Sequence, residues 1–409
     1  MATLAYAYKG RDSNGKVVKG RLDGATEGAV ASRLRTMGVS PISIEESKEG
    51  TGLSKEISIP GFSKGVGLKD LAIMSRQMAT MIAAGLSLLR TLTILAEQTE
   101  NKALASTLSA VRTDIEGGSS LSGSFAKFPR VFPRLMIHLV RAGETGGFLD
   151  GALESIANNF ESDVKLRATI KSAMTYPVAV LMMAFVAVVA MLIFIVPVFQ
   201  AMFTSLGGQL PLPTQILVTL SQNMIWIFPL SIVLIVSFNV WWRFNKQSDK
   251  VRSVVDPLKL KVPVFGSLFA KVAVARFTRN FSAMIAAGVP ILQSLSIVGE
   301  TSGNWVIEEA LKKVQESVRT GNSIAAPLAE QPIFPSMVVQ MIAVGEDSGA
   351  LEIMLTKVAD FYEEEVQSTA EALTSLIEPL MIAVIGTIIG GMIVALYMPI
   401  FTIFNQINK

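Results

Sequence analysis

Two long stretches of this sequence lack any charged side chain, and they limit its possible folds more than any other feature. Asp, Glu, Lys and Arg are absent between Lys171 and Arg243, and again between Glu378 and Lys409. A helix crosses the hydrocarbon core of a bilayer with about 20 apolar residues, and both stretches are longer than that. The sequence therefore predicts a membrane protein, in agreement with a mean hydropathy of +0.48.

The apolar runs predict three membrane helices, and the basic residues around them predict how the chain crosses the bilayer. The predicted spans are residues 175–202, 217–242 and 377–404. Cytoplasmic loops carry an excess of Lys and Arg. The predicted connector 243–271 is rich in both, whereas the loop 203–216 has no charge. We therefore expect a cytoplasmic N-terminus, and an extracytoplasmic tail at residues 405–409.

The start of the chain has a different pattern, which predicts a small module with strands. Two strand-like runs flank Ser13-Asn14-Gly15, and Asn-Gly favours a tight hairpin turn because both residues tolerate positive φ. Thr26 is a suitable N-cap for a helix that begins at Glu27, and a third strand-like run follows it. We expect residues 1–45 to form a ββαβ module and residues 46–68 to form a flexible linker.

The rest of the sequence contains an internal repeat with an offset of about 202–203 residues. The segment from Arg76 to Gly85 returns as Arg279 to Gly288. The later landmarks recur in the same order, as Gly143, Glu144, Gly147 and Pro177, and then as Gly345, Glu346, Gly349 and Pro379. Apolar residues in each half recur at helical spacing. We predict a mainly α polytopic protein with two repeated cytoplasmic six-helix bundles, at 69–174 and 272–376.

The residue types that are missing exclude several kinds of chemistry. The sequence has no Cys, a single histidine (His138) and no GxxxxGK[ST] phosphate loop. Thiol catalysis, metal sites built from several Cys or His ligands, and nucleotide binding through such a loop are therefore excluded. A net charge of +3 gives no reason to expect nucleic acid as a partner. We expect no catalytic residue, no metal, no cofactor and no enzymatic activity.

The N-terminal module, the repeated Met-Ile-Ala-Ala-Gly and Gly-Glu motifs, and the proline that opens two spans together resemble the PilC/GspF family. Its members are inner-membrane platform proteins of type IV pilus and type II secretion machines. The resemblance implies a multi-pass protein of the bacterial inner membrane that couples a hexameric ATPase to insertion or removal of pilin or pseudopilin subunits. It also implies contact with the lipid bilayer and other inner-membrane assembly proteins, and a homo-oligomer, with a dimer favoured.

Two pairs of polar residues at equivalent positions are candidates for contacts with a partner. Glu144 and Glu346 lie in glycine-flanked turns. There a carboxylate can meet a partner or a cation, or it can accept backbone N–H bonds where the following helix begins. Arg76 and Arg279 begin matching helices, and they can face a partner or form internal salt bridges. We favour the internal contact for both pairs.

Glycine and proline residues mark further positions of interest. Gly85 and Gly288 are predicted to end helices. Gly386 and Gly390 form a small-xxx-small pattern, which predicts close approach to the first span, to another protomer or to pilin. Pro177 and Pro379 lie where the predicted bundles enter the membrane. Each proline removes one helical hydrogen bond, so the position is either an articulation point or an ordinary bend.

Two other classes of function stay open. Repeats and membrane helices also fit an oligomeric transporter or channel, although the predicted spans contain no ionisable residue except Glu378 near an edge, and such residues normally mark ion paths. A membrane adaptor with no role in filament assembly is the other alternative. The sequence does not separate a pilus from a secretion machine, or an extension ATPase from a retraction ATPase.

Overall fold

The structure of the protein, a computed structural model, consists of two units, Met1–Gly65 and Val66–Lys409. The described residues are 4–11, 17–24, 26–46, 65–205, 210–246 and 248–407. The predicted turn at Ser13-Asn14-Gly15, most of the predicted linker 46–68 and the last two residues of the predicted tail lie outside them.

The N-terminal unit contains the predicted ββαβ module. Its elements are β1 (Leu4–Arg11), β2 (Val17–Gly24), α1 (Glu27–Thr36) and β3 (Ser40–Glu46). β1 lies in the centre of the sheet and pairs antiparallel with both other strands. The Thr26 side chain accepts a hydrogen bond from the backbone N–H of Ala29, which confirms the predicted N-cap. Tyr6, Val30 and Leu34 form the core between helix and sheet.

The second unit begins with six consecutive helices. They are α2 (Leu68–Ala83), α3 (Leu88–Gln98), α4 (Lys102–Glu116), α5 (Leu121–Ala126), α6 (Arg134–Gly146) and α7 (Leu149–Ala190). Local signals set several of their boundaries. The side chains of Asn101 and Ser120 accept N-cap hydrogen bonds at α4 and α5. Gly85 follows α2 with a φ of +86°, which glycine adopts without steric strain.

A second set of six helices follows in the same order. They are α11 (Gly266–Ala286), α12 (Ile291–Thr301), α13 (Trp305–Arg319), α14 (Ala325–Ala329), α15 (Ser336–Ser348) and α16 (Leu351–Ile407). Gly288, with a φ of +66°, follows α11, so both predicted helix stops are confirmed. The predicted connector 243–271 contains a further helix, α10 (Asp249–Lys261). Because α11 already begins at Gly266, the second set starts inside the predicted connector.

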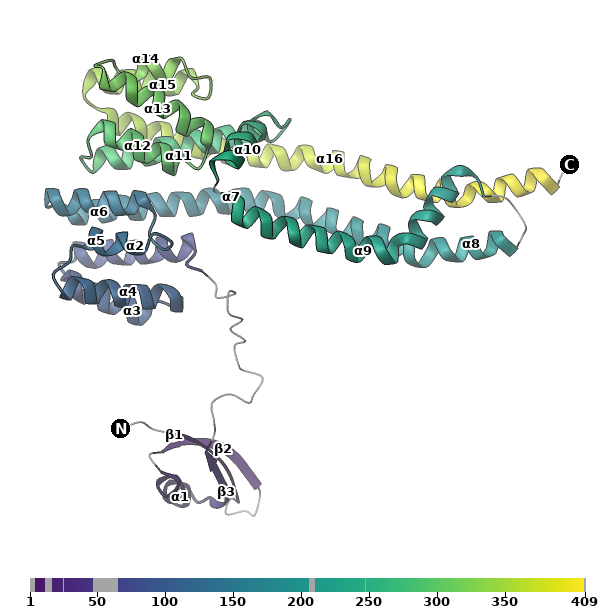
Figure 1. The fold of residues 1–409 in the computed structure, drawn as a ribbon, viewed down its shortest axis with the longest axis horizontal. Coiled ribbons are helices and arrows are strands. Elements are labelled where there is room, and N and C mark those ends of the chain that lie inside the picture. Colours follow the sequence, from purple (N-terminus) through teal and green to yellow (C-terminus); the bar gives the residue numbers. More distant parts are fainter. Residues whose placement is uncertain are drawn as a thin grey trace. The chain divides into compact units, whose positions relative to one another are not determined.

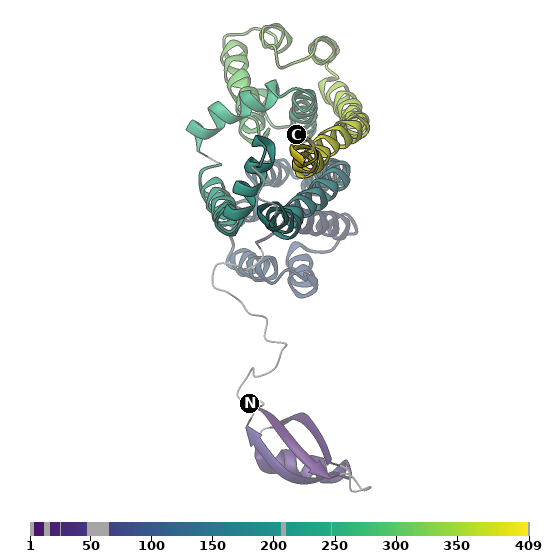
Figure 2. The same ribbon diagram turned by 90° about the vertical axis from the view of Figure 1, so that its right-hand side faces the viewer.

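The two sets of helices share one hydrophobic core. Helix α7 packs against α2, α11 and α16, and one continuous cluster of buried residues extends over both sets. Figure 1 shows α6 and α7 of the first set beside α11 and α12 of the second, and Figure 2 shows these helices end-on. The division of this region into two repeated six-helix bundles therefore stays a prediction.

Three helices in the described part of the chain are long and apolar enough to cross a membrane. The first consists of α7, a π-helical segment (Met191–Ile195) and α8 (Val196–Ser205), the second is α9 (Leu212–Asn245), and the third is α16. Helices α7 and α16 continue without a break past Pro177 and Pro379. Both α8 and α9 extend into the predicted loop 203–216. Pro213 lies in the first turn of α9, a position that suits proline.

Buried hydroxyl groups connect the three membrane helices. Thr214 of α9 donates a hydrogen bond to the Ala395 carbonyl of α16. Ser221 of α9 donates to the Leu192 carbonyl in the π-helical segment at 2.5 Å. Interhelical bonds of this kind, made away from water, help to hold membrane helices together.

Gly386 and Gly390 of α16 do not take part in this packing. A Cβ atom added at Gly386 or Gly390 would meet no atom within 4 Å. Of the three contacts that the sequence left open, close approach to the first span is therefore not seen among the described residues, because the packing between the spans uses other faces of α16. Contact with another protomer or with pilin stays a prediction.

Candidate functional site

Glu144 holds the start of a neighbouring short helix. Its Oε1 and Oε2 atoms accept hydrogen bonds from the backbone N–H groups of Leu121 and Ser122, at 2.5 and 3.1 Å. These groups belong to the first turn of α5, where N–H donors have no partner within the helix. The positive end of the helix dipole also favours a carboxylate at this position.

Glu346 makes the same contact in the second set. Its carboxylate accepts from the backbone N–H groups of Ile324 and Ala325 at the start of α14, at 2.6 and 2.9 Å. The favoured internal contact is confirmed for both glutamates. The partner helix differs from the prediction, because each glutamate caps the helix before its own and not the one that follows. Among the described residues, no group of three or more Asp, Glu or His side chains is placed to hold a metal ion.

The glycines beside these glutamates have two different roles. Gly143 and Gly345 lie where α6 and α15 touch the next helix. An added Cβ would lie 2.6 Å from a side-chain carbon of α7 in the first case, and 2.9 Å from the backbone of α16 in the second. Gly147 and Gly349 have φ values of +74° and +68°, which turn the chain into those helices. These four residues therefore fix the helix hairpins.

Arg76 joins α2 to α7 through three side chains. It donates hydrogen bonds to Glu154 at 2.7 Å, to Glu161 at 2.6 Å and to Asn158 at 2.5 Å. The hydrogen bond from Arg76 is the largest effect on Glu161, and it lowers the pKa of that carboxyl. The internal salt bridge that we favoured is confirmed. Arg76 does not begin its helix, since α2 starts eight residues earlier at Leu68.

Arg279 repeats this arrangement between α11 and α16. It donates to Asp360 at 2.5 Å and to Glu363 at 2.8 Å. The Arg279 side chain is 19% exposed, against 32% for Arg76. It also lies in the middle of its helix, because α11 extends the apolar surface N-terminally to Gly266. In both sets, an arginine thus fixes the first helix to the long helix that leads to the membrane.

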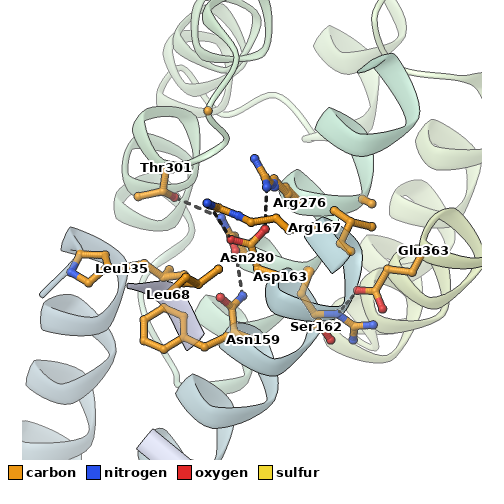
Figure 3. Close-up of a pocket in the computed structure, with 16 residues that line it drawn as sticks. Leu68, Leu135, Asn159, Ser162, Asp163, Arg167, Arg276, Asn280, Thr301 and Glu363 are labelled. Carbon is orange, nitrogen blue, oxygen red and sulfur yellow. Dashed lines mark hydrogen bonds and ion pairs between the residues drawn. The ribbon is translucent and has the colours of Figure 1, made fainter. Parts of the chain in front are cut away.

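A cavity of about 280 Å³ lies between the two sets of helices (Figure 3). Beside it, Asp163 of α7 pairs with Arg276 of α11 at 2.7 Å and with Arg167 at 3.0 Å. The Asn159 amide donates to the Asn280 oxygen at 2.8 Å, and this hydrogen bond is buried. Paired charges and amides next to apolar side chains give a specific junction between the two sets.

The sequence-based predictions did not include this junction, because they rested on residues that the two halves share. Asp163 keeps a carboxylate at its counterpart Glu365, whereas its partner Arg276 and the two asparagines lie where the halves differ. Arg276 and Asn280 correspond to Ile73 and Gln77 in the first half, and Asn159 corresponds to Phe361 in the second. Departures from the repeat were therefore the available signal.

His138, the single histidine, lies on α6 near the loop that leads into α12. It lines a cavity together with Gly288 and Pro290. Burial, followed by the positive charge of Arg141, lowers its pKa. Its buried Nδ1 atom has no hydrogen-bond partner among the described residues.

Comparison with known proteins relates this sequence to one family. The family model described as type II secretion system protein F matches residues 74–197 and again residues 277–399. The model for the N-terminal domain of the same protein matches residues 1–45. The chain belongs to the type II secretion system protein F family. The double match of the protein F model supports the internal repeat, and the third match covers the ββαβ module.

Individual relatives in the protein F family match nearly the whole chain. The type IV pilus assembly protein PilC of Thermus thermophilus is 42% identical over 98% of this chain and 99% of its own length. PilC of Myxococcus xanthus is 39% identical, over 100% and 97%. Type II secretion system protein F of Vibrio cholerae is 31% identical, over 99% and 100%. The predicted membership of the PilC/GspF family is confirmed, and this is a family of platform proteins and not a known enzyme family.

Proposed function

We propose that this protein is the inner-membrane platform of a type IV pilus machine. In this role it couples a hexameric cytoplasmic ATPase to the insertion or removal of pilin subunits. Four relatives named for type IV pilus assembly are 35–42% identical to the chain. A type 4 fimbrial assembly protein PilC and the relatives named type II secretion system protein F are 31% identical. This difference favours a pilus over a secretion pseudopilus, for which pseudopilins would take the place of pilin.

The observation that carries the proposal is the continuity of α7 and α16. They contain 42 and 57 residues, and each joins its own set of helices to an apolar span without interruption. A helix rises about 1.5 Å per residue, so the part of α7 between Leu149 and Pro177 is about 40 Å long. If an ATPase displaced either set of helices, the long helix would therefore carry that movement to the bilayer, where pilin is inserted.

Contacts between the two long helices support a shared movement. Leu166 of α7 belongs to one apolar cluster with Val366, Ala370 and Leu373 of α16. Further towards the membrane, the Thr374 hydroxyl donates to the Ala173 carbonyl at 3.3 Å. An arginine cluster also fixes each long helix to its own set. We therefore infer that each set is a six-helix bundle whose movement its long helix transmits to the membrane.

The proposed topology places both sets of helices in the cytoplasm, with the C-terminal tail outside. Basic residues of the connector, including Arg243, Lys246 and Lys250, support this orientation. The absence of Cys allows a direct test. In intact cells, an impermeant thiol reagent should leave Lys313→Cys, an exposed position on α13, unlabelled. Labelling of this variant in unbroken cells would contradict the topology.

The proposed partnership with an ATPase is tested by two measurements. The sequence lacks a phosphate loop, so the purified protein should hydrolyse no ATP, but in nanodiscs it should raise the turnover of its cognate ATPase. Deletion of the gene should abolish surface pili, and the wild-type gene should restore them. Normal piliation in the deletion strain would refute the pilus assignment. Ion flux in proteoliposomes at rates above lipid-only controls would favour the transporter alternative.

A further inference from the structure

Helix α10 (Asp249–Lys261) lies between the second membrane-compatible helix and the second set of helices (Figure 1). Only residues 246–248 separate it from the end of α9 at Asn245. A chain extends at most about 3.6 Å per residue, so α10 begins within about 15 Å of the end of α9. Because α9 is long and apolar enough to cross a membrane, the start of α10 is held close to the bilayer surface.

One face of α10 packs against the second set. The buried carboxylate of Asp256 accepts hydrogen bonds from the backbone N–H of Trp305 at 3.0 Å and from Lys259 at 2.9 Å. On the same face, Arg252 pairs with Glu308 at 2.8 Å. Trp305 is the first residue of α13, where backbone N–H groups have no partner within the helix. These contacts hold α10 on the start of α13 and fix which face it turns outward.

The opposite face of α10 combines apolar and basic side chains. Helical residues three or four apart are neighbours on the surface, so one stripe contains Lys250, Val254, Leu258 and Lys261. We name it the α10 stripe, and all four of its residues are exposed. Val254 is 66% exposed and Leu258 is 62% exposed. Adjacent apolar side chains with lysines beside them are typical of a helix that lies in the interface of a membrane.

The residues that lead into α10 have the same character. Trp241 and Phe244, at the end of α9, are 50% and 81% exposed, and aromatic side chains are common where a membrane helix leaves the bilayer. Arg243 and Lys246 are exposed as well. Neither they nor the two lysines of the α10 stripe form an ion pair with another described residue. Basic side chains next to a span attract anionic lipid headgroups.

We propose that the α10 stripe lies on the bilayer surface and binds anionic lipid. Val254 and Leu258 enter the boundary between headgroups and acyl chains, and Lys250 and Lys261 reach lipid phosphates through their flexible side chains. Because α9 already holds α10 at the bilayer, docking is an intramolecular step, and a short apolar stripe is enough. The contact connects the start of α13 to the membrane, so the second set is tied to the bilayer at α10 as well as through α16.

Spin labelling of the full chain tests the position of the α10 stripe and does not depend on the proposed pilus function. The absence of Cys allows a single nitroxide at Leu258→Cys, in nanodiscs that contain anionic phosphatidylglycerol. The label should collide more often with oxygen, which concentrates in lipid, and less often with a water-soluble nickel chelate. Val254→Cys should behave in the same way. Lys313→Cys, an exposed position on α13, is the control for a side chain in water.

Removal of the two lysines tests the contact with anionic headgroups. Lys250→Gln/Lys261→Gln should lower the ratio of docked to undocked label about 30-fold in the anionic nanodiscs, at about 1 kcal/mol per lysine. In nanodiscs of phosphatidylcholine alone, the same changes should leave the ratio unaltered. Lys313→Gln/Lys357→Gln is the matched control, because it removes the same charge at exposed positions outside α10.

Three results would overturn the proposal. The first is equal access of the nickel chelate to labels at Leu258 and Lys313, which would show that the stripe faces water. The second is shielding of the Leu258 label only after the cognate ATPase is added, which would indicate a protein partner in place of lipid. The third is a ratio that both pairs of lysine changes lower equally, or that the Lys250→Gln/Lys261→Gln variant leaves unchanged in anionic nanodiscs.

Discussion

Removal of the Glu144 carboxylate should loosen α5 by an amount that the structure allows us to estimate. The carboxylate accepts two backbone hydrogen bonds, and both donor residues, Leu121 and Ser122, are buried. A hydrogen bond to a charged group contributes about 1.5–3 kcal/mol. Glu144 itself is only half-buried, so we take about 2 kcal/mol for the pair. Local opening of α5 should then become about 30-fold more frequent in Glu144→Ala.

Hydrogen–deuterium exchange of the full chain in detergent measures this opening directly. Amides in the peptide covering α5 should exchange about 30-fold faster in Glu144→Ala, and by a smaller factor in Glu144→Gln, which keeps an acceptor oxygen but loses the charge. The second set supplies the matched control, because Glu346→Ala should accelerate exchange in α14 and leave α5 unchanged. Unchanged α5 exchange in Glu144→Ala, or equal acceleration in both helices, would refute the reasoning.

Three further changes test the contacts within the helical layers. Arg279→Ala should lower thermal stability in detergent by about 1 kcal/mol more than Arg76→Ala. Arg279 is the less exposed of the two arginines, so its removal leaves carboxylates that are less well solvated. Equal losses of stability in the two variants would contradict this prediction. Burial lowers the pKa of His138, so protonation of this side chain opposes folding. As the pH falls below 6.5, the wild-type protein should therefore lose stability relative to His138→Gln. Parallel pH profiles of stability for the two proteins would contradict this prediction. Asn280→Ala leaves a buried amide of α7 unpaired and should cost about 1–3 kcal/mol, whereas the matched exposed change Gln77→Ala should have little effect on thermal melting.

Much of the fold follows from local patterns in the sequence. The apolar runs predicted three membrane-compatible helices, and Gly85 and Gly288 predicted helix ends because positive φ favours glycine. The Thr26 cap was also visible locally. These features depend on a few neighbouring residues, so the residues alone specify them.

The packing between distant helices was harder to predict. Glu144 lies two residues before the end of its own helix, and no local pattern indicates that its carboxylate reaches α5. Periodicity gives the buried face of a helix but not its partner, which is why the sequence left the partner of Gly386 open. Arg276 of the Asp163–Arg276 junction has an isoleucine as its counterpart in the first half, so the repeat itself gives no sign of this ion pair.

Transmission of movement to the membrane by α7 requires this helix to be stiff and unbroken. Three exposed positions on α7 lie between the first set of helices and Pro177, namely Ala168, Lys171 and Ser172. Changing all three to glycine weakens the helix by about 1 kcal/mol per residue without altering its register. The control carries alanine at Lys171 and Ser172 and keeps the native Ala168. Surface pili are counted in cells with matched protein levels. The account predicts that the glycine variant loses piliation while the alanine control keeps it, and normal piliation in the glycine variant would contradict rigid transmission.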